Sequence, residues 1–245
     1  MTTEMLFLLC FAILLVAFLY SAVGHAGASG YIAVMTLFGL APTVIKPSAL
    51  VLNILVATLT FYQFWRAGHF SWPLFWPFAI LSVPLAFLGG YVNLPTHWFK
   101  ILVGVVLLYS AVRFLFNTQT DDSEIAPPSK AVAVGTGAGL GLLSGLTGTG
   151  GGIFLTPLMI FFHWSKTKTA SGVSALFILV NSIAGLLGNL SSTKQLPLFA
   201  LPMVVAALAG GAVGSYLGSR QFSVGFIKKL LAVVLLIAGY KLVFT

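Results

Sequence analysis

Two glycine-rich stretches, GHAGASG at residues 24–30 and GLTGTGGG at residues 145–152, each interrupt a run of apolar sequence. Each is followed by an apolar segment of only 11 residues, at 31–41 and 153–163. As a helix, such a segment is about 16 Å long, roughly half the thickness of the bilayer core. We therefore expect each glycine loop to lie at membrane depth, before a half-helix. Irregular backbone at that depth must be buried in protein or line a cavity, and we expect these loops to line a cavity.

The rest of the composition is that of a membrane protein. Of the 245 residues, 59% are hydrophobic and only 7% are charged. An apolar run of about 18 residues is long enough to span the hydrocarbon core. Runs that approach or meet this length are found at 6–23, 48–65, 72–91, 99–116, 170–190, 196–217 and 226–244. The sequence predicts an all-α integral membrane protein.

The chain contains an internal repeat. FKILVGVVLLYSAVRFLF (99–116) matches IKKLLAVVLLIAGYKLVF (227–244) at a shift of 128, which also aligns Asn53 with Asn181. The glycine loops align at a shift of 123, with Gly27 on Gly150. A stretch containing three of the four acidic residues separates the halves. We predict a first transmembrane repeat at 1–117, a polar linker at 118–130 and a second transmembrane repeat at 131–245.

The positive charges predict the topology. If each loop and half-helix enters and leaves on the same side, each half crosses the membrane an odd number of times and the repeats are inverted. The positive-inside rule then favours a cytoplasmic linker with both termini outside. The net charge of +8 is spread singly between apolar segments, which fits this rule and speaks against nucleic-acid binding. The single cysteine, Cys10, excludes an intrachain disulfide.

The acidic residues Glu4, Asp121, Asp122 and Glu124 all lie outside the predicted spans. A carboxylate at membrane depth is the usual mark of a cation or proton site, so its absence speaks against a cation pump. No hydrolase, metalloprotease or phosphate-loop motif occurs. We expect a protein that is not an enzyme and has no cofactor and no metal site.

The glycine loops themselves predict a binding site. A half-helix that starts at depth presents free amide groups and the positive end of its dipole, and helix N-termini bind anions. Two such ends converging from inverted repeats would hold an anion without a buried charged residue. Close helix packing is the alternative use of the same glycines. The candidate substrate-binding residues in the loops are Gly24, His25, Gly27, Ser29, Gly30, Thr147, Gly148, Thr149, Gly150, Gly151 and Gly152.

Three further polar side chains lie at predicted depth. His25 titrates near neutral pH, so it is a candidate for binding an anion or carrying a coupled proton, although a bond to nearby backbone is equally compatible with its place. Asn53 and Asn181 lie within apolar helices, where an amide needs a partner. They are candidates either for lining the site or for bonding between helices.

The glycine loops in this setting also resemble a known family. KPSALVLNILVATLTFYQFWRAGHF in the first half, with GLLSGLTGTGGGIFLTPLMI and KTASGVSALFILVNSIAGLLGNL in the second, are similar to the TauE/SafE sulfite-exporter family. The resemblance covers nearly the whole chain. It implies a multi-pass transporter of the bacterial inner membrane for sulfur-containing anions such as sulfite, thiosulfate or organosulfonates.

The sequence therefore favours a secondary transporter, and an exporter, of a small sulfur oxyanion. The partners that it implies are this substrate, the lipid bilayer and protons as a coupling ion. A homo-oligomer is left open. A passive anion channel is the alternative within transport. A membrane-embedded enzyme, assembly factor or scaffold of sulfur metabolism is the alternative from another class.

Overall fold

The computed structural model describes residues 3–40, 42–92, 124–193 and 201–223, with short pieces at 108, 112 and between 225 and 240. The eight helices that can be named in these ranges are all α-helices, and five of them are long and apolar enough to cross a membrane. The prediction of an all-α membrane protein is confirmed. Most of the predicted spans 99–116 and 226–244 and residues 118–123 of the linker lie outside the described residues.

The first half contributes three long helices and one short one. The short helix, α2, has ten residues and confirms the predicted half-helix, although it begins earlier than expected. After α2, the two long helices α3 and α4 are separated by a turn at Gly68. A tryptophan and a proline begin α4. The helices are α1 (Thr3–Ala22), α2 (Ala28–Leu37), α3 (Pro42–Arg66) and α4 (Trp72–Tyr91).

The second half repeats this order. Its short helix, α7, also has ten residues. Its first helix, α6, contains several glycines and is absent from the seven apolar runs identified in the sequence. The described part of the linker, 124–129, has no regular secondary structure and leads directly into α6. The helices are α6 (Lys130–Thr147), α7 (Gly152–Phe161), α8 (Thr167–Thr193) and α9 (Leu201–Arg220).

The two half-helices correspond closely. They begin 124 residues apart, and each follows a glycine with a left-handed backbone, Gly27 (φ 100°) or Gly151 (φ 75°). Such a backbone is easy for glycine and strained for other residues. The structural correspondence is therefore 124, one residue more than the shift of 123 predicted for the loops. At this shift, His25 of the first half is equivalent to Thr149 of the second half.

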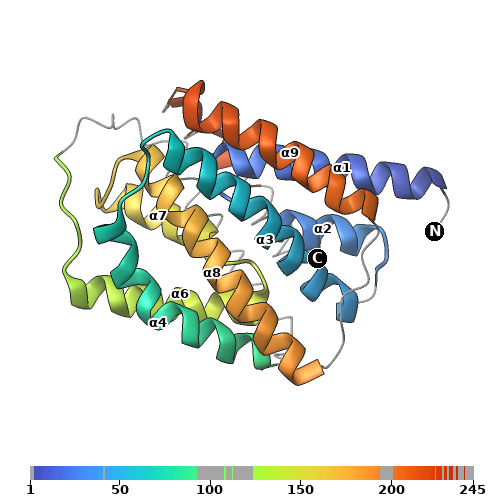
Figure 1. The fold of residues 1–245 in the computed structure, drawn as a ribbon, viewed down its shortest axis with the longest axis horizontal. Helices are drawn as coiled ribbons and strands as arrows, with labels where there is room; N and C mark the ends of the chain where they lie inside the picture. Colours follow the sequence, from blue (N-terminus) through green and yellow to red (C-terminus); the bar gives the residue numbers. More distant parts are fainter. Residues whose placement is uncertain are drawn as a thin grey trace.

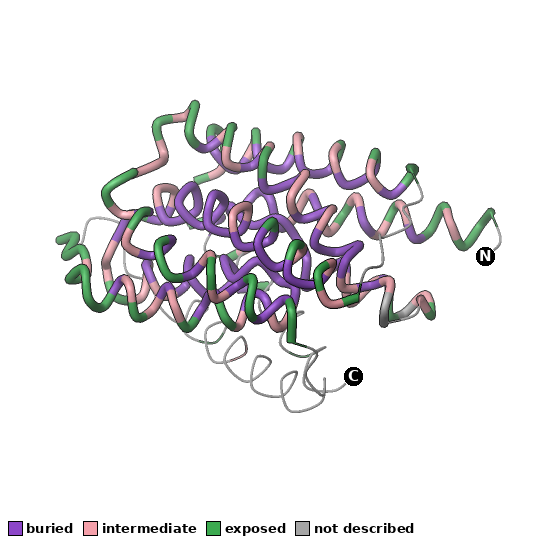
Figure 2. The backbone as a smooth tube through the Cα atoms, turned by 60° about the horizontal axis from the view of Figure 1, so that its bottom comes forward, coloured by how far each residue is buried: buried purple, intermediate pink, exposed green. Residues whose placement is uncertain are grey.

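The long helices form three layers (Figure 1). α1 packs on α9 along one side, α4 packs on α6 along the other, and α3 and α8 lie between these pairs. Exchanging the two halves converts the α1–α9 contact into the α6–α4 contact and leaves the α3–α8 contact as it is. α8 is the most enclosed of the five candidate spans, because 72% of its apolar window is buried. Figure 2 shows that the most buried backbone runs through the centre of the bundle.

The central helices α3 and α8 run in opposite directions. Asn53 of α3 bonds to Ser182 of α8, while Phe64, further along α3, lies beside Gly172, earlier in α8. Corresponding helices of inverted repeats must be antiparallel, and these two are. The inverted orientation of the halves in a bilayer stays a prediction.

Glycines bring the outer pairs into backbone contact. Along α6, Gly137 and Gly141 face the backbone of α4, where added Cβ atoms would overlap with Phe78 and Ser82. Along α9, Gly210, Gly214 and Gly218 face α1 in the same manner. Small residues that permit such approach are typical of membrane helix pairs. These glycines therefore serve close packing in both outer pairs.

Gly139, which also belongs to the regularly spaced glycines of α6, has open space where a Cβ would be. We expect Gly141→Ala to cost about 1–3 kcal/mol, because its methyl group overlaps with the Ser82 backbone. Gly139→Ala is the matched control and should retain the full stability. Thermal unfolding of the purified variants in detergent measures the difference. Equal unfolding temperatures for the two variants would show that the close α4–α6 contact is not formed.

Candidate functional site

The first glycine loop is buried between α1 and α8. After α1 ends, Gly24 adopts a left-handed backbone (φ 85°), and its position leaves no room for a side chain beside Ser171. The Ser171 hydroxyl donates a 2.9 Å hydrogen bond to the carbonyl of Val23. His25 is 1% exposed. The loop is therefore enclosed by protein and held by a side chain of the other half.

The second glycine loop contains three glycines with left-handed backbones. They are Gly148, which ends α6, and then Gly150 and Gly151. The Thr147 hydroxyl accepts a hydrogen bond from the backbone N–H of Thr149, and the two threonine hydroxyls are 2.8 Å apart and share another. This short network fixes the loop ahead of α7.

Asn53 joins the two loops. Its Oδ1 accepts a 3.1 Å bond from the N–H of Ala28, the first residue of α2. Its Nδ2 donates to the Thr149 carbonyl at 3.4 Å and to the Ser182 hydroxyl at 2.9 Å. Asn53 is fully buried. One side chain of α3 therefore connects the start of one half-helix with the loop that precedes the other.

His25 makes a second connection between the halves. Its Nε2 lies 3.0 Å from the Thr156 hydroxyl of α7. Its Nδ1 is buried and has no hydrogen-bond partner among the described residues. The imidazole thus reaches from the first loop to the first turns of α7.

Three residues near the start of α7 carry buried polar atoms without a partner in the described part of the chain. Besides Nδ1 of His25, the buried hydroxyls of Ser144 and Ser174 have no partner within the described ranges. Ser144 lies beside Gly151, and the backbone of Ser174 lies beside Gly152. Buried polar groups are normally hydrogen-bonded, so three unpaired ones at one place need an explanation. The N–H groups of Phe154 and Leu155 bond to the Gly151 carbonyl, so the amides of α7 that can join this set are the two before them. Together they form a set of neutral groups that suits a polar ligand.

The predicted site residues divide into two groups. Most members of the two loops and Asn53 are brought together, whereas Ser29 and Gly30 face α1 and Asn181 lies elsewhere. Asn181 accepts a 2.5 Å bond from the Ser82 hydroxyl of α4 and donates to the carbonyl of Phe177. It ties α8 to α4, which is the interhelical role that the sequence left open.

Two loop residues on α2 face α1. The Ser29 hydroxyl donates to Tyr20 Oη at 3.0 Å, and a side chain on Gly30 would overlap with Val16. Both residues therefore support the half-helix in this conformation. Their positions in the motif suggested direct contact with a ligand, but no pattern in the sequence indicated the partners on α1.

Sequence reasoning missed four polar side chains that complete the site. Ser182 follows Asn181 directly, and the remaining three are small or aromatic residues within apolar helices. What they share is a hydroxyl group in an otherwise apolar segment. Hydroxyl residues are too frequent in such segments for this feature to predict a site. They are Tyr20, Thr156, Ser171 and Ser182.

We expect Asn53→Ala to loosen both loops, because it leaves the Ala28 N–H and the Thr149 carbonyl without this partner. Losing about 1.4 kcal/mol of local stability speeds amide exchange about tenfold. Hydrogen–deuterium exchange of residues 24–30 and 147–152 measures the effect. Asn181→Ala is the matched control, and it should accelerate exchange in α4 and α8 while leaving the loops unchanged. Loop protection that survives Asn53→Ala would contradict the bridging role.

The geometry defines a class: an integral membrane protein of two corresponding halves, whose two half-helices start from buried loops at its centre. Among the described residues, no group of histidine, cysteine, aspartate or glutamate side chains could hold a metal ion. The family model "Sulfite exporter TauE/SafE" matches residues 9–242. The chain belongs to the TauE/SafE family and is a multi-pass membrane transporter.

Two relatives agree with this assignment. The chain is 39% identical over 239 residues to "Probable membrane transporter protein y4hK" of Sinorhizobium fredii, covering 96% of each chain. It is 28% identical over 187 residues to "Probable membrane transporter protein YunE" of Bacillus subtilis, covering 68% of each. No solved structure matches the chain. A transporter of this family implies a small-molecule substrate and a lipid bilayer.

Proposed function

We propose that this protein is a secondary transporter that exports a small sulfur-containing anion, such as sulfite, thiosulfate or an organosulfonate, across the bacterial inner membrane. The anion binds between the glycine loops, at the start of α7. The observation that carries the proposal is the group of unpartnered polar atoms there, on His25, Ser144 and Ser174. The family name supports sulfite or a related anion as the substrate.

The electrostatics of this place favour an anion. Two half-helices start beside the loops, and Asn53 bonds both to the first N–H of α2 and to the loop before α7, so the positive ends of two helix dipoles are joined through one side chain. Glu4 and Glu124 are the acidic residues within the described ranges, and both are exposed and distant in sequence from the loops. Hydroxyl and amide donors can then stabilise negative charge without a buried lysine or arginine at the binding position.

Transport requires that this enclosed place open alternately to each side. Asn53 and His25 tie each loop to the other half, so movement of one half against the other would reshape the site. Such rocking about a central site is common in transporters with inverted repeats. In this scheme the linker is cytoplasmic and the termini lie outside. Positive residues gather at the linker end of the bundle, which supports that orientation: Arg66, Lys130, Lys166, Lys168 and Arg220.

A panel of anions tests the substrate. Ligand that binds the folded state raises its stability by about 2.7 kcal/mol at one hundred times its dissociation constant. We expect sulfite, thiosulfate or a small organosulfonate to raise the melting temperature of the purified protein, and sulfate and simple carboxylates to leave it unchanged. No shift with any sulfur anion, together with no uptake into proteoliposomes, would reject the proposed substrate class.

A glycine substitution locates the site in the same assay. Gly151→Val forces a side chain into a left-handed position beside the Phe177 ring and displaces the start of α7. We expect it to abolish the shift caused by the anion. Gly139→Val, at an open position, should keep that shift. A full anion response in the Gly151 variant would move the site away from α7.

Coupling to protons is assigned to His25, because among the described residues it is the ionisable side chain that lies in one glycine loop and contacts the half-helix that follows the other. We expect anion flux by the wild-type protein in proteoliposomes to increase severalfold when a pH gradient is imposed. His25→Gln should bind the same anion yet show flux that no longer responds to the gradient. Flux that ignores the gradient in the wild-type protein would instead indicate a passive channel.

A further inference from the structure

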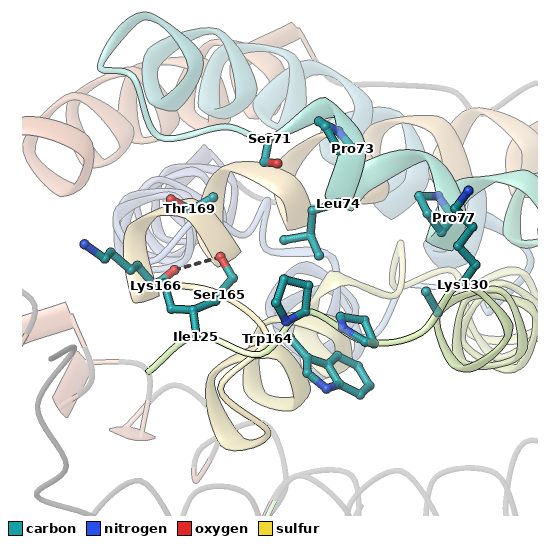
Figure 3. A pocket seen from close by; sticks show the side chains of 13 residues that line it. Ser71, Pro73, Leu74, Pro77, Ile125, Lys130, Trp164, Ser165, Lys166 and Thr169 are labelled. Carbon is teal, nitrogen blue, oxygen red and sulfur yellow. Dashed lines mark hydrogen bonds between the residues drawn. The ribbon is translucent and has the colours of Figure 1, made fainter. Parts of the chain in front are cut away.

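A cavity of about 440 Å³ lies at the linker end of the molecule, apart from the glycine loops (Figure 3). Its wall combines the start of α4 from the first half, the linker, and the starts of α6 and α8 from the second half. The linker is held there because the N–H of Ala126 donates a 3.0 Å bond to the carbonyl of His163, in the turn after α7. The cavity therefore joins three separate parts of the chain.

The charged side chains that line this cavity are positive, and the exposed Glu124 directly precedes Ile125 of its wall. Lys130 and Lys166 both line it and stand on opposite sides of it in Figure 3. No acidic residue is among the residues that line it. The starts of three helices add partial positive charge, and Ser71, which precedes α4, makes no side-chain cap to that helix. These features are complementary to an anionic group.

The rest of the wall is apolar. Leu74, Trp164 and four prolines make up much of the lining. Just beside it on α4, Trp72 and Trp76 are 46% and 60% exposed. Exposed tryptophans of this kind are enriched where lipid meets water, at the level of the headgroups. The cavity thus offers positive charge and an apolar wall at the depth of the lipid phosphates.

We propose that this cavity binds an anionic phospholipid, with its phosphate between Lys130 and Lys166 and its glycerol against the prolines and Trp164. A free inorganic anion would use the lysines but not the apolar wall. A lipid uses both, and it reaches the cavity from the adjacent bilayer. The bound headgroup links α4 of one half to the linker and α8 of the other. This inference does not depend on the identity of the transported anion.

Native mass spectrometry of the delipidated protein in detergent tests the proposal. The probes are dioleoylphosphatidylglycerol, dioleoylphosphatidylcholine, inorganic phosphate and glycerol 3-phosphate. We expect the anionic lipid to be retained preferentially. Each lysine near a membrane surface contributes about 1 kcal/mol, so Lys130→Ala with Lys166→Ala should weaken its retention by about thirtyfold. The doubly substituted Lys130→Arg and Lys166→Arg protein should retain it.

Arg66→Ala is the matched control. Arg66 carries the same charge at the same end of the bundle, but it bonds to Tyr62 and does not line the cavity. The control variant should bind the lipid as the wild-type protein does. Equal loss in both variants would show a general surface attraction and overturn the proposal. The proposal would also be overturned if inorganic phosphate or glycerol 3-phosphate were retained as well as the anionic lipid. Loss of a dimer in the double alanine variant alone would overturn it too.

Discussion

Backbone groups at membrane depth must find hydrogen-bond partners within the protein, because lipid offers none. This fold starts two short helices from buried glycine loops at the centre of the bundle, and at membrane depth both loops have to meet that requirement. Asn53 meets part of it at both, since one amide bonds to the first N–H of α2 and to a carbonyl of the second loop. Ser171 serves the first loop from α8. Each break is thus completed by a helix of the other half, so neither half can form its loop alone.

The long helices follow from the same requirement. A loop can be completed from the other half only if α3 and α8 cross beside it, and their antiparallel course brings Asn53 and Ser182 together. The outer pairs enclose this centre. Glycines on α6 and α9 let these helices touch the backbones of α4 and α1, which leaves little space for lipid near the loops. The numerous glycines therefore serve two purposes, backbone direction in the loops and close approach along the seams.

Much of this arrangement could be predicted from the sequence, because local rules decide it. A glycine cluster followed by ten or eleven apolar residues predicts a buried loop and a half-helix, and both are present. The limits of α4 also follow from its proline, its tryptophans and its apolar length. Tertiary contacts decide the rest. Asn53 and Asn181 match in the repeat and are equally buried, yet one bridges the loops and the other ties α8 to α4. The cavity at the linker joins segments far apart in sequence, and no local pattern marks it.

The scaffold is close to symmetric, but the chemistry at its centre is not. His25 corresponds to Thr149. In the first loop Gly24 contacts Ser171, whereas in the second loop Gly148 contacts the aliphatic chain of Lys46. In a perfectly symmetric repeat protein, the states open to either side would be equivalent and equal in energy. Under the proposed mechanism, a difference of even 1.4 kcal/mol between them changes their populations tenfold. The residues that break the correspondence therefore set which side the empty transporter faces. Direction would then depend on a few side chains around the loops, while the shared helical frame provides the movement itself.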